Sequence, residues 1–546
     1  MTRLGLTLAG LALFASPAVA QRTSSAINEA DLRYRLGILA DDSMLGRESA
    51  RLGNVRATDY LAAELQRLGL ERAGENGTWF QTIPLLTRTF DATSALRVGG
   101  ATLALGTDFI PLRPAGGAAL GGTFRAEGVP VVFGGRIGDP AMLAPDSARG
   151  KFVVFLPATT GGLAGSQGRL NAYREAAAIG IAALDNLPPP IAAFLRAEVV
   201  LLVDSSLPQP RPIPSVMLTG NAAQQLLGTA PGTASPGIAG GTVSGNFGFV
   251  EGPSPYPSRN VIGIVRGTDR ARRNSYVALG VHSDHVGVGP VLEHDSVRAY
   301  NAVIRPFGAN QQPRQPTAEE AAQIRAILDS LRALRPPRPD SVFNGADDDA
   351  SGISVALELA EYFRRNPPRR SILFVFHTAE ERGLFGAQYY TEHPTVPRDS
   401  IVANINLDQV SRGGPDDVPG STANTLYLLG TRRLSTELGD LVEAVNARGH
   451  NLNLNYEYDA NGHPANGYCR SDHWMYARWG IPVAFFSAGW HRDYHMVTDE
   501  VAYANTGTML KVANFVRDVT RAVADLDHAP VVDQPKPQDP RGPCRQ

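Results

Sequence analysis

The chain has 546 residues, of which 43% are hydrophobic and 19% charged, a composition typical of globular proteins with a large buried core. Its formal net charge is -2, so no charge excess favours binding to nucleic acid or to an anionic membrane surface. This length predicts roughly two to four structural units.

The first residues have the pattern of a secretory signal peptide over residues 1–20. Arg3 supplies positive charge, Leu4–Phe14 is apolar, and the small residues Ala18–Ala20 offer a cleavage site. No later stretch approaches the roughly 18 uninterrupted apolar residues of a membrane-spanning helix. We therefore expect an exported protein, periplasmic or secreted, with no stable membrane span.

Two different residue patterns follow the predicted signal peptide. Residues 27–72 read as helical, because Leu61, Leu65 and Leu68 recur at helical spacing. The next region has short apolar runs separated by glycine and proline, which predicts a mostly β domain inserted into the main one. The expected segments are 21–95 for the first part of the main domain, 96–250 for the inserted domain and 251–529 for the rest of the main domain.

After Asn260, strand and helix patterns alternate. The continuous apolar run Ile372–Phe376 is typical of a strand buried on both faces. Further strands are predicted at Tyr276–Val281, Ile401–Leu407, Leu426–Leu429 and Pro482–Phe486, and helices at Ile353–Phe363, Leu434–Val445 and Thr508–Val523. The alternation predicts an α/β fold with a mixed, largely parallel sheet sandwiched by helices.

Two segments do not fit this alternation. Residues 291–342 form an insertion with its own predicted helix, Ala318–Leu334, isolated by proline-rich flanks. We expect it to form a helical flap beside the cleft. The proline-rich tail 530–546 is predicted to be disordered. Cys469 and Cys544 are the only cysteines, and the sequence leaves open whether they pair in an oxidising compartment or stay free.

Histidines and carboxylates follow the predicted strands at five places. They are His282 with Asp284, the acidic run Asp347-Asp348-Asp349, the pair Glu380-Glu381, then Asp408, and finally Tyr494-His495. Because the carboxyl ends of parallel strands meet at one edge of a sheet, we expect these side chains to converge there. Two histidines and three carboxylates suffice for two metal ions that share one carboxylate, and mixed N/O ligation fits Zn²⁺, with Co²⁺ or Mn²⁺ as substitutes.

Other chemistries have weaker support. His377 and Glu380 form an HxxE spacing used by single-zinc carboxypeptidases, but that choice leaves the other clusters idle. A calcium loop at Asp347–Asp349 lacks the alternating ligands and terminal glutamate of an EF-hand. The sequence contains no HExxH, GxSxG or GxxxxGK[ST] motif.

The five motifs, in this order, resemble the M28 family of zinc exopeptidases over most of residues 27–525. The resemblance implies that Asp348 bridges two zinc ions. It further implies the remaining roles: His282 and Asp408 complete one site, Glu381 and His495 complete the other, Glu380 is the general base, Asp284 orients His282, and Tyr494 helps to stabilise the oxyanion. It also implies a cis peptide bond between Asp348 and Asp349. Residues 125–225 resemble a protease-associated domain.

One departure from the family pattern is the separation of 66 residues between His282 and Asp348 (348 minus 282), which results from the insertion. The expected activity is an aminopeptidase that acts on short peptides. A carboxypeptidase or dipeptidase of the same fold remains the alternative, since Arg470, Arg478 and Arg492 flank the last motifs. Two further rivals are a binding protein without catalysis and a cyclase or amide-forming transferase, which would normally use one metal ion. The sequence does not indicate the oligomeric state.

Overall fold

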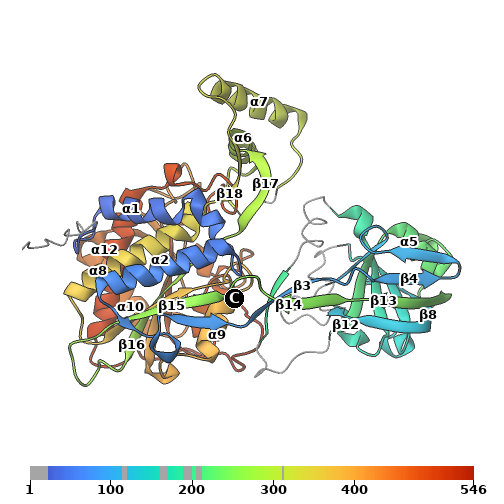
Figure 1. Cartoon of the computed structure of the whole chain (residues 1–546), viewed down its shortest axis with the longest axis horizontal. Coiled ribbons are helices and arrows are strands. Elements are labelled where there is room, and N and C mark those ends of the chain that lie inside the picture. The colour runs from blue at the N-terminus through green and yellow to red at the C-terminus, as the bar shows by residue number, and fades with distance from the viewer. Residues whose placement is uncertain are drawn as a thin grey trace, which may run out of the picture.

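A computed structural model describes residues 23–112, 120–159, 169–187, 199–203, 212–309, 311 and 313–546. The predicted signal peptide, residues 1–20, lies outside these residues. None of the helices in the described ranges is long and apolar enough to cross a membrane. The chain forms two lobes joined by extended strands, and a helical projection rises from the larger lobe (Figure 1).

The larger lobe is built on a mixed sheet, sheet A, which has nine strands among the described residues. The central strands β19, β16, β20 and β23 run parallel, whereas β15 pairs antiparallel with β19, and β21 pairs antiparallel with β23. Along the sheet the bounds are β1 Glu71–Arg72, β2 Phe80–Ile83, β15 Ser258–Val265, β19 Ser371–His377, β16 Tyr276–His282, β20 Ile401–Leu407, β23 Val483–Ser487, β21 Thr425–Leu429 and β22 Asn453–Asn455. The predicted α/β fold is confirmed.

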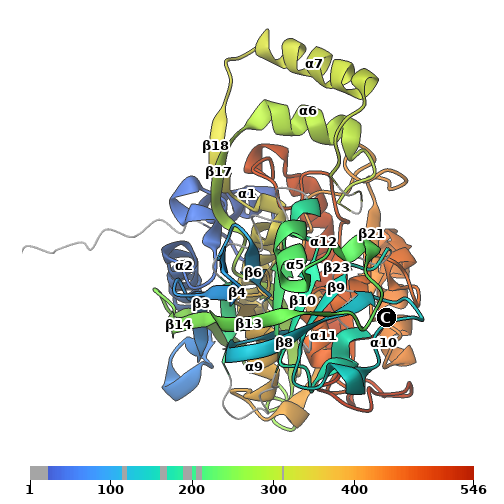
Figure 2. The same ribbon diagram turned by 90° about the vertical axis from the view of Figure 1, so that its right-hand side faces the viewer.

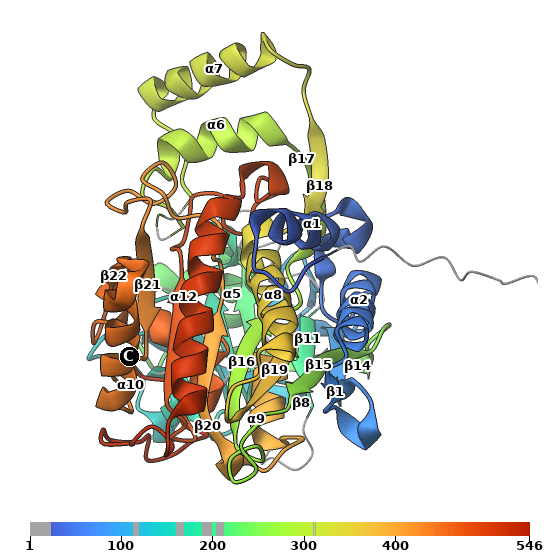
Figure 3. The ribbon, with the colours of Figure 1, turned by 90° about the vertical axis from the view of Figure 1, so that its left-hand side faces the viewer.

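Helices cover both faces of sheet A. The first face is covered by α1 Glu29–Leu39, α2 Leu52–Leu68, α8 Gly352–Arg365, α10 Thr436–Val445 and α12 Thr506–Asp525 (Figure 3). The second face is covered by the shorter helices α9 Phe385–Glu392 and α11 His473–Ala477. Apolar side chains alternate between the two cores along each strand: Leu373 and Val375 of β19 face the second core, and Phe374 faces the first.

The smaller lobe is an inserted, mostly β domain built on sheet C, which is consistent with a protease-associated domain. Its strands are β4 Ala95–Val98, β5 Ala101–Ala104, β6 Phe109–Pro111, β7 Leu120–Gly122, β8 Phe124–Arg136, β9 Phe152–Leu156, β10 Ala178–Ala182, β12 Ile213–Leu218 and β13 Ala239–Phe247, and its described residues also include the helix α5 Gly220–Leu227. A three-stranded sheet of β3 Leu85–Phe90, β11 Val199–Leu202 and β14 Phe249–Pro253 connects the lobes (Figure 1).

The insertion between His282 and Asp348 forms the projection. An antiparallel ribbon of β17 Gly287–Glu293 and β18 Pro339–Phe343 leads out to two helices, α6 His294–Ile304 and α7 Ala318–Arg332, which lie one above the other (Figure 2). We call residues 287–343 the flap. The sequence predicted only its second helix.

The N-terminal helical prediction is corrected at one point. Within 27–72 the helix is interrupted after α1, because Leu45 and Gly46 have φ of 50° and 61° and turn the chain. This turn brings Arg47 into the interior, where its side chain is 0% exposed.

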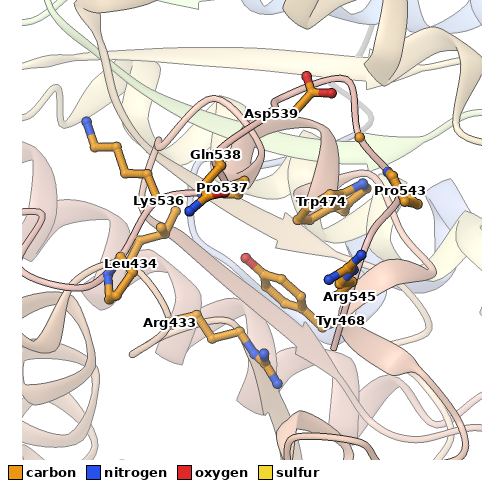
Figure 4. A pocket seen from close by; sticks show the side chains of 12 residues that line it. Arg433, Leu434, Tyr468, Trp474, Lys536, Pro537, Gln538, Asp539, Pro543 and Arg545 are labelled. Carbon is orange, nitrogen blue, oxygen red and sulfur yellow. The ribbon is translucent and has the colours of Figure 1, made fainter.

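The prediction of a disordered tail is wrong. Cys469 and Cys544 form a disulfide, and Val532 and Cys544 pack against the second core. The Asp533 carboxylate also accepts a hydrogen bond of 2.9 Å from the Thr436 N–H. We call residues 530–546 the C-terminal strap. Between it and the domain lies a cavity of about 600 Å³, lined by Arg433, Tyr468, Trp474 and strap residues (Figure 4).

Candidate active site

The predicted metal ligands converge at the carboxyl edge of sheet A. His282 ends β16, Glu381 lies four residues beyond β19, and Asp408 follows β20 directly. Asp348 precedes α8, and His495 lies in the loop after β23. The arrangement follows from parallel pairing, since β16, β19 and β20 all end at the same edge.

Two groups of ligand atoms share Asp348. One contains His282, Asp348 and Asp408, the other contains His285, Asp348, Glu381 and His495, and the ligand atoms of each group lie within 4.8 Å of one another. The two oxygens of Asp348 face different histidines: Oδ1 is 3.0 Å from His282 Nε2, and Oδ2 is 3.1 Å from His495 Nε2. This is the position that a bridging carboxylate occupies.

The remaining pairs complete the two groups. His282 Nε2 lies 3.5 Å from Asp408 Oδ1, and His495 Nε2 lies 2.9 Å from Glu381 Oε2. Asp348 Oδ2, Asp408 Oδ1 and His495 Nε2 are buried atoms, and these contacts lack the geometry of a hydrogen bond in the described part of the chain. Buried imidazole nitrogens and carboxylate oxygens without hydrogen bonds, aimed at common points, fit a pair of borderline cations such as Zn²⁺.

Glu380 lies beside these groups without joining either. It lines a small pocket together with Asp348, Asp408, Arg470 and Tyr494. Burial raises the pKa of its carboxyl well above the usual value, and the nearby carboxylates act in the same direction. A buried carboxyl next to the metal groups is placed to exchange a proton with a bound water or a leaving group.

The contact that orients His282 differs from the expected one. His282 Nδ1 lies 3.1 Å from the backbone oxygen of Asp284 but 4.0 Å from its carboxylate. The Asp284 carboxylate instead accepts a hydrogen bond of 3.1 Å from the Glu380 N–H. Burial raises the pKa of Asp284 to about 7. Asp284 therefore supports His282 through its main chain and positions Glu380 through its side chain.

The three carboxylates of the acidic run Asp347–Asp349 have different contacts: one faces the metal groups, and two accept backbone hydrogen bonds. Asp349 accepts backbone hydrogen bonds from His282 at 3.2 Å and from Gly352 at 3.0 Å. Asp347 accepts a hydrogen bond of 2.6 Å from the Ser411 N–H. Only Asp348 is left facing both histidines. The cis peptide bond expected between Asp348 and Asp349 is present.

Several contributors were missed by the sequence analysis. His285, three residues after His282, is fully buried with Nδ1 at 2.9 Å from Glu381 Oε1. Both carboxylate oxygens of Asp472 are buried without a partner among the described residues, and this carboxylate helps to raise the pKa of Glu380. Arg47 donates four hydrogen bonds to backbone oxygens, three of which belong to the loop that ends at Asp348. His285 belongs to the same short segment as His282 and Asp284, which was a signal for it, but no local pattern marks Arg47.

Tyr494 belongs to a row of stacked side chains beside the pocket. Its ring lies 3.8 Å from the His495 ring, and its hydroxyl accepts a hydrogen bond of 3.3 Å from Arg470. The Arg470 guanidinium lies 4.7 Å from the centre of the Trp490 ring, which in turn is 4.5 Å from Tyr458. The row runs from a predicted metal ligand outward along the cleft.

The cleft beside His495 has a volume of about 830 Å³. Its walls come from the flap, from the segment around Tyr494 and from residues 457–470, which we call the cleft loop. The lining residues are Arg305, Phe307, Ala309, Pro313, Val418, Pro419, Tyr427, Glu457, Tyr458, His463, Pro464, Ala465, Arg470, Tyr494, His495 and Met496.

The flap is fixed to the segment that carries Tyr494 and His495. The Arg305 guanidinium donates to the Arg492 carbonyl at 3.0 Å, and the Ala309 N–H donates to the Trp490 carbonyl at 3.2 Å. Phe307 lies between these anchors and is 66% exposed at the edge of the cleft. The expected position of the insertion beside the cleft is therefore observed.

Comparison with known proteins now gives the family. Residues 260–520 match the model described as Peptidase family M28. The chain belongs to this family. The matched range contains all five motifs and excludes the inserted β domain.

Individual relatives extend the comparison of this M28 chain. The aminopeptidase from Aneurinibacillus sp. strain AM-1 shares the fold, with a TM-score of 0.51 and 16% identity over 93% of this chain and 98% of that one. A probable zinc metalloprotease of Pyrenophora tritici-repentis is 41% identical over 73 residues, 13% of this chain and 17% of that protein. A vacuolar membrane protease of Candida glabrata is 28% identical over 186 residues, 30% of this chain and 17% of that protein. The matches thus span less than a fifth of these curated relatives.

Proposed function

We propose that this M28 protein is an exported aminopeptidase that binds two zinc ions and removes N-terminal residues from short peptides. The observation that carries the proposal is Glu380, a carboxylate in the pocket beside the metal groups that belongs to neither group. Asp348, Glu380 and Asp408 line this pocket, and Arg470 is the one cation among its lining residues. Two bound zinc ions would compensate the charge of Asp348 and Asp408, so Glu380 would be left to attract a free N-terminal ammonium and to repel a C-terminal carboxylate.

The site residues have two kinds of role: some would bind the metal ions, and others would act on the water molecule and the substrate. His282 and Asp408 would hold one ion, Glu381 and His495 the other, and Asp348 both. Bound ions of this kind activate a water molecule and polarise the scissile carbonyl. Glu380 is placed to accept the proton of that water and to return it to the leaving amine. The Tyr494 hydroxyl, held by Arg470, is placed to donate a hydrogen bond to the developing oxyanion.

The carboxypeptidase alternative requires cations aimed at the substrate carboxylate. Of the three arginines that flank the last motifs, Arg478 is paired with Glu392 at 2.6 Å, and Arg492 donates to the Asp416 carbonyl. Only Arg470 of the three faces the pocket. One arginine already stacked between Trp490 and Tyr494 supports this alternative less well than the carboxylates support an aminopeptidase.

Export and peptide length have separate support. The Cys469–Cys544 disulfide favours an oxidising compartment, in agreement with the signal-peptide pattern. The flap and the cleft loop wall the cleft from two directions, which favours short or unfolded peptides over folded proteins. The fold shared with the Aneurinibacillus aminopeptidase and the short matches to zinc metalloproteases agree with zinc-dependent peptide hydrolysis.

The deciding experiment measures hydrolysis of Leu-p-nitroanilide by the purified mature protein with bound zinc. We expect release of p-nitroaniline, its loss when the substrate amine is acetylated, and its loss and recovery when zinc is chelated and restored. Glu380→Gln serves as the inactive control, because it keeps the metal ligands. Faster release of C-terminal residues from N-blocked peptides would refute the aminopeptidase assignment.

A further inference from the structure

The C-terminal strap is fastened to the wall of the substrate cleft. The Cys469–Cys544 disulfide joins the strap to the end of the cleft loop, with the two Cα atoms 5.7 Å apart. Cys469 directly precedes Arg470, which lines both the cleft and the pocket beside the metal groups. The attachment is therefore one residue away from a side chain that would face the substrate.

Gln546, the last residue of the sequence, makes a second attachment through its side chain. Its amide nitrogen donates to the carbonyls of Tyr458 at 2.6 Å and Ala460 at 2.9 Å. Its amide oxygen accepts a hydrogen bond of 3.1 Å from the Tyr468 N–H, and its backbone oxygen accepts one of 3.2 Å from the Gly462 N–H. One glutamine thus ties together both ends of the cleft loop.

The cleft loop has little regular structure of its own. It contains only two short 3₁₀ turns, Glu457–Asp459 and Gly467–Cys469, between β22 and α11. A further support is Arg433, whose guanidinium donates to the Asp459 carboxylate at 2.6 Å and lies over the Tyr468 ring. Figure 4 shows Arg433 and Tyr468 on one side of the strap cavity, with strap residues around the other. The backbone hydrogen bonds within the loop all join residues three apart, so they form local turns and do not tie its two ends together. The overall shape of the loop therefore depends on these external contacts.

The shape of the loop matters because it supplies the outer wall of the cleft. Glu457, Tyr458, His463, Pro464, Ala465 and Arg470 all line the cavity. Tyr458 also stacks on Trp490 and on Tyr427, with ring centres 4.5 and 4.7 Å apart. A shift of the loop would displace this aromatic wall and Arg470, whereas His282, Glu381 and Asp408 lie at or near the ends of sheet A strands and would keep their positions.

We infer that the C-terminal strap positions the substrate-binding wall, with Cys544 and Gln546 acting as positioning residues for peptide binding. This inference rests on the proposed peptidase function. Neither residue lines the cleft, so each acts through the cleft loop. Loosening the strap should weaken binding of the peptide beyond its first residue, while the chemistry at the metal ions and Glu380 continues.

The test compares Gln546→Ala with the control variant Gln538→Ala. Gln538 is an exposed glutamine of the same strap with no hydrogen bond to the cleft loop among those described. For a tripeptide substrate, we expect Gln546→Ala to raise KM by about three- to tenfold, as expected for the loss of one or two net hydrogen bonds. We expect kcat to stay within about twofold, and zinc content and melting temperature to match those of Gln538→Ala. Hydrogen–deuterium exchange should accelerate in residues 457–470 and stay unchanged in β20.

The disulfide is tested in the same way with the Cys469→Ala/Cys544→Ala variant and with wild type treated with a phosphine reductant that does not chelate zinc. Both should raise KM, and the reductant should have no effect on the double variant. Unchanged KM and unchanged exchange in Gln546→Ala would overturn the inference. If the zinc-loaded wild type hydrolyses no peptide, the proposed function fails, and the exchange measurement still decides whether the strap holds the loop.

Discussion

Replacement of Arg47 with alanine tests how the loop that carries Asp348 is held. The buried guanidinium donates to the carbonyls of Leu39 at 2.8 Å, Asn344 at 2.6 Å, Gly345 at 2.9 Å and Asp348 at 3.1 Å. Hydrogen bonds to a charged group contribute about 1.5–3 kcal/mol each, so four of them set an upper limit of roughly 6–12 kcal/mol. Removing the buried cation recovers several kcal/mol of desolvation energy. We therefore expect a net loss of about 3–5 kcal/mol in the free energy of unfolding.

Loss of the Arg47 hydrogen bonds should also weaken metal binding, because three of the four carbonyls belong to the loop that ends at Asp348. Removal of such a supporting contact typically weakens metal affinity by about 10- to 100-fold. Calorimetry of the main domain and zinc competition with a chelator measure the two effects. Arg56→Ala is the matched control, since Arg56 is exposed on the next helix and donates only to the Ser43 carbonyl among the bonds described. Stability and zinc affinity of Arg47→Ala equal to those of Arg56→Ala would refute the reasoning.

Four further outcomes are expected. Glu380→Gln should retain zinc and lose about 10²- to 10⁴-fold in kcat, because it removes the proton acceptor; wild-type turnover would exclude that role. Glu381→Ala should lose zinc from one site by metal analysis, and full occupancy of both sites would contradict its assignment as a ligand. Gly308→Ala should cost about 1–3 kcal/mol in a melting experiment, because Gly308 has φ of 85° and an added Cβ would lie 2.3 Å from the Trp490 carbonyl oxygen. Deletion of residues 291–342 should leave the main domain folded but change KM or the preferred peptide length, whereas identical kinetics for all lengths would assign the insertion another role.

Three of the predicted ligands, His282, Glu381 and Asp408, could be found from sequence because each lies at the end of a buried strand or within four residues of it. The apolar runs locate β16, β19, β20 and β23 to within one or two residues, and parallel pairing brings their ends together. Within the acidic run, only the family resemblance pointed to Asp348 as the shared ligand. Asp347, Asp348 and Asp349 are chemically identical, and only the folded backbone decides which of them accepts N–H groups.

Contacts between distant segments account for most of what the sequence did not reveal. Arg47 resembles any surface arginine in a helical stretch, and its acceptors are main-chain oxygens that carry no residue signature. The prediction that the C-terminal strap is disordered failed for a similar reason. Its proline-rich composition is typical of disorder, but the disulfide and the Gln546 side chain supply contacts that composition does not encode.

The ribbon at the base of the flap has a consequence for how this enzyme family can vary. Gly287 pairs with Phe343, so the two ends of the insertion are joined by a ladder next to the main domain. The entropy of closing a loop rises slowly with its length, by about 0.6 kcal/mol per doubling, and the ladder confines that cost to the residues beyond it. The tip can therefore be lengthened, shortened or exchanged with little effect on the distance between His282 and Asp348. The ribbon makes this position a natural graft point, where a new substrate-facing element can be installed while the metal groups keep their geometry.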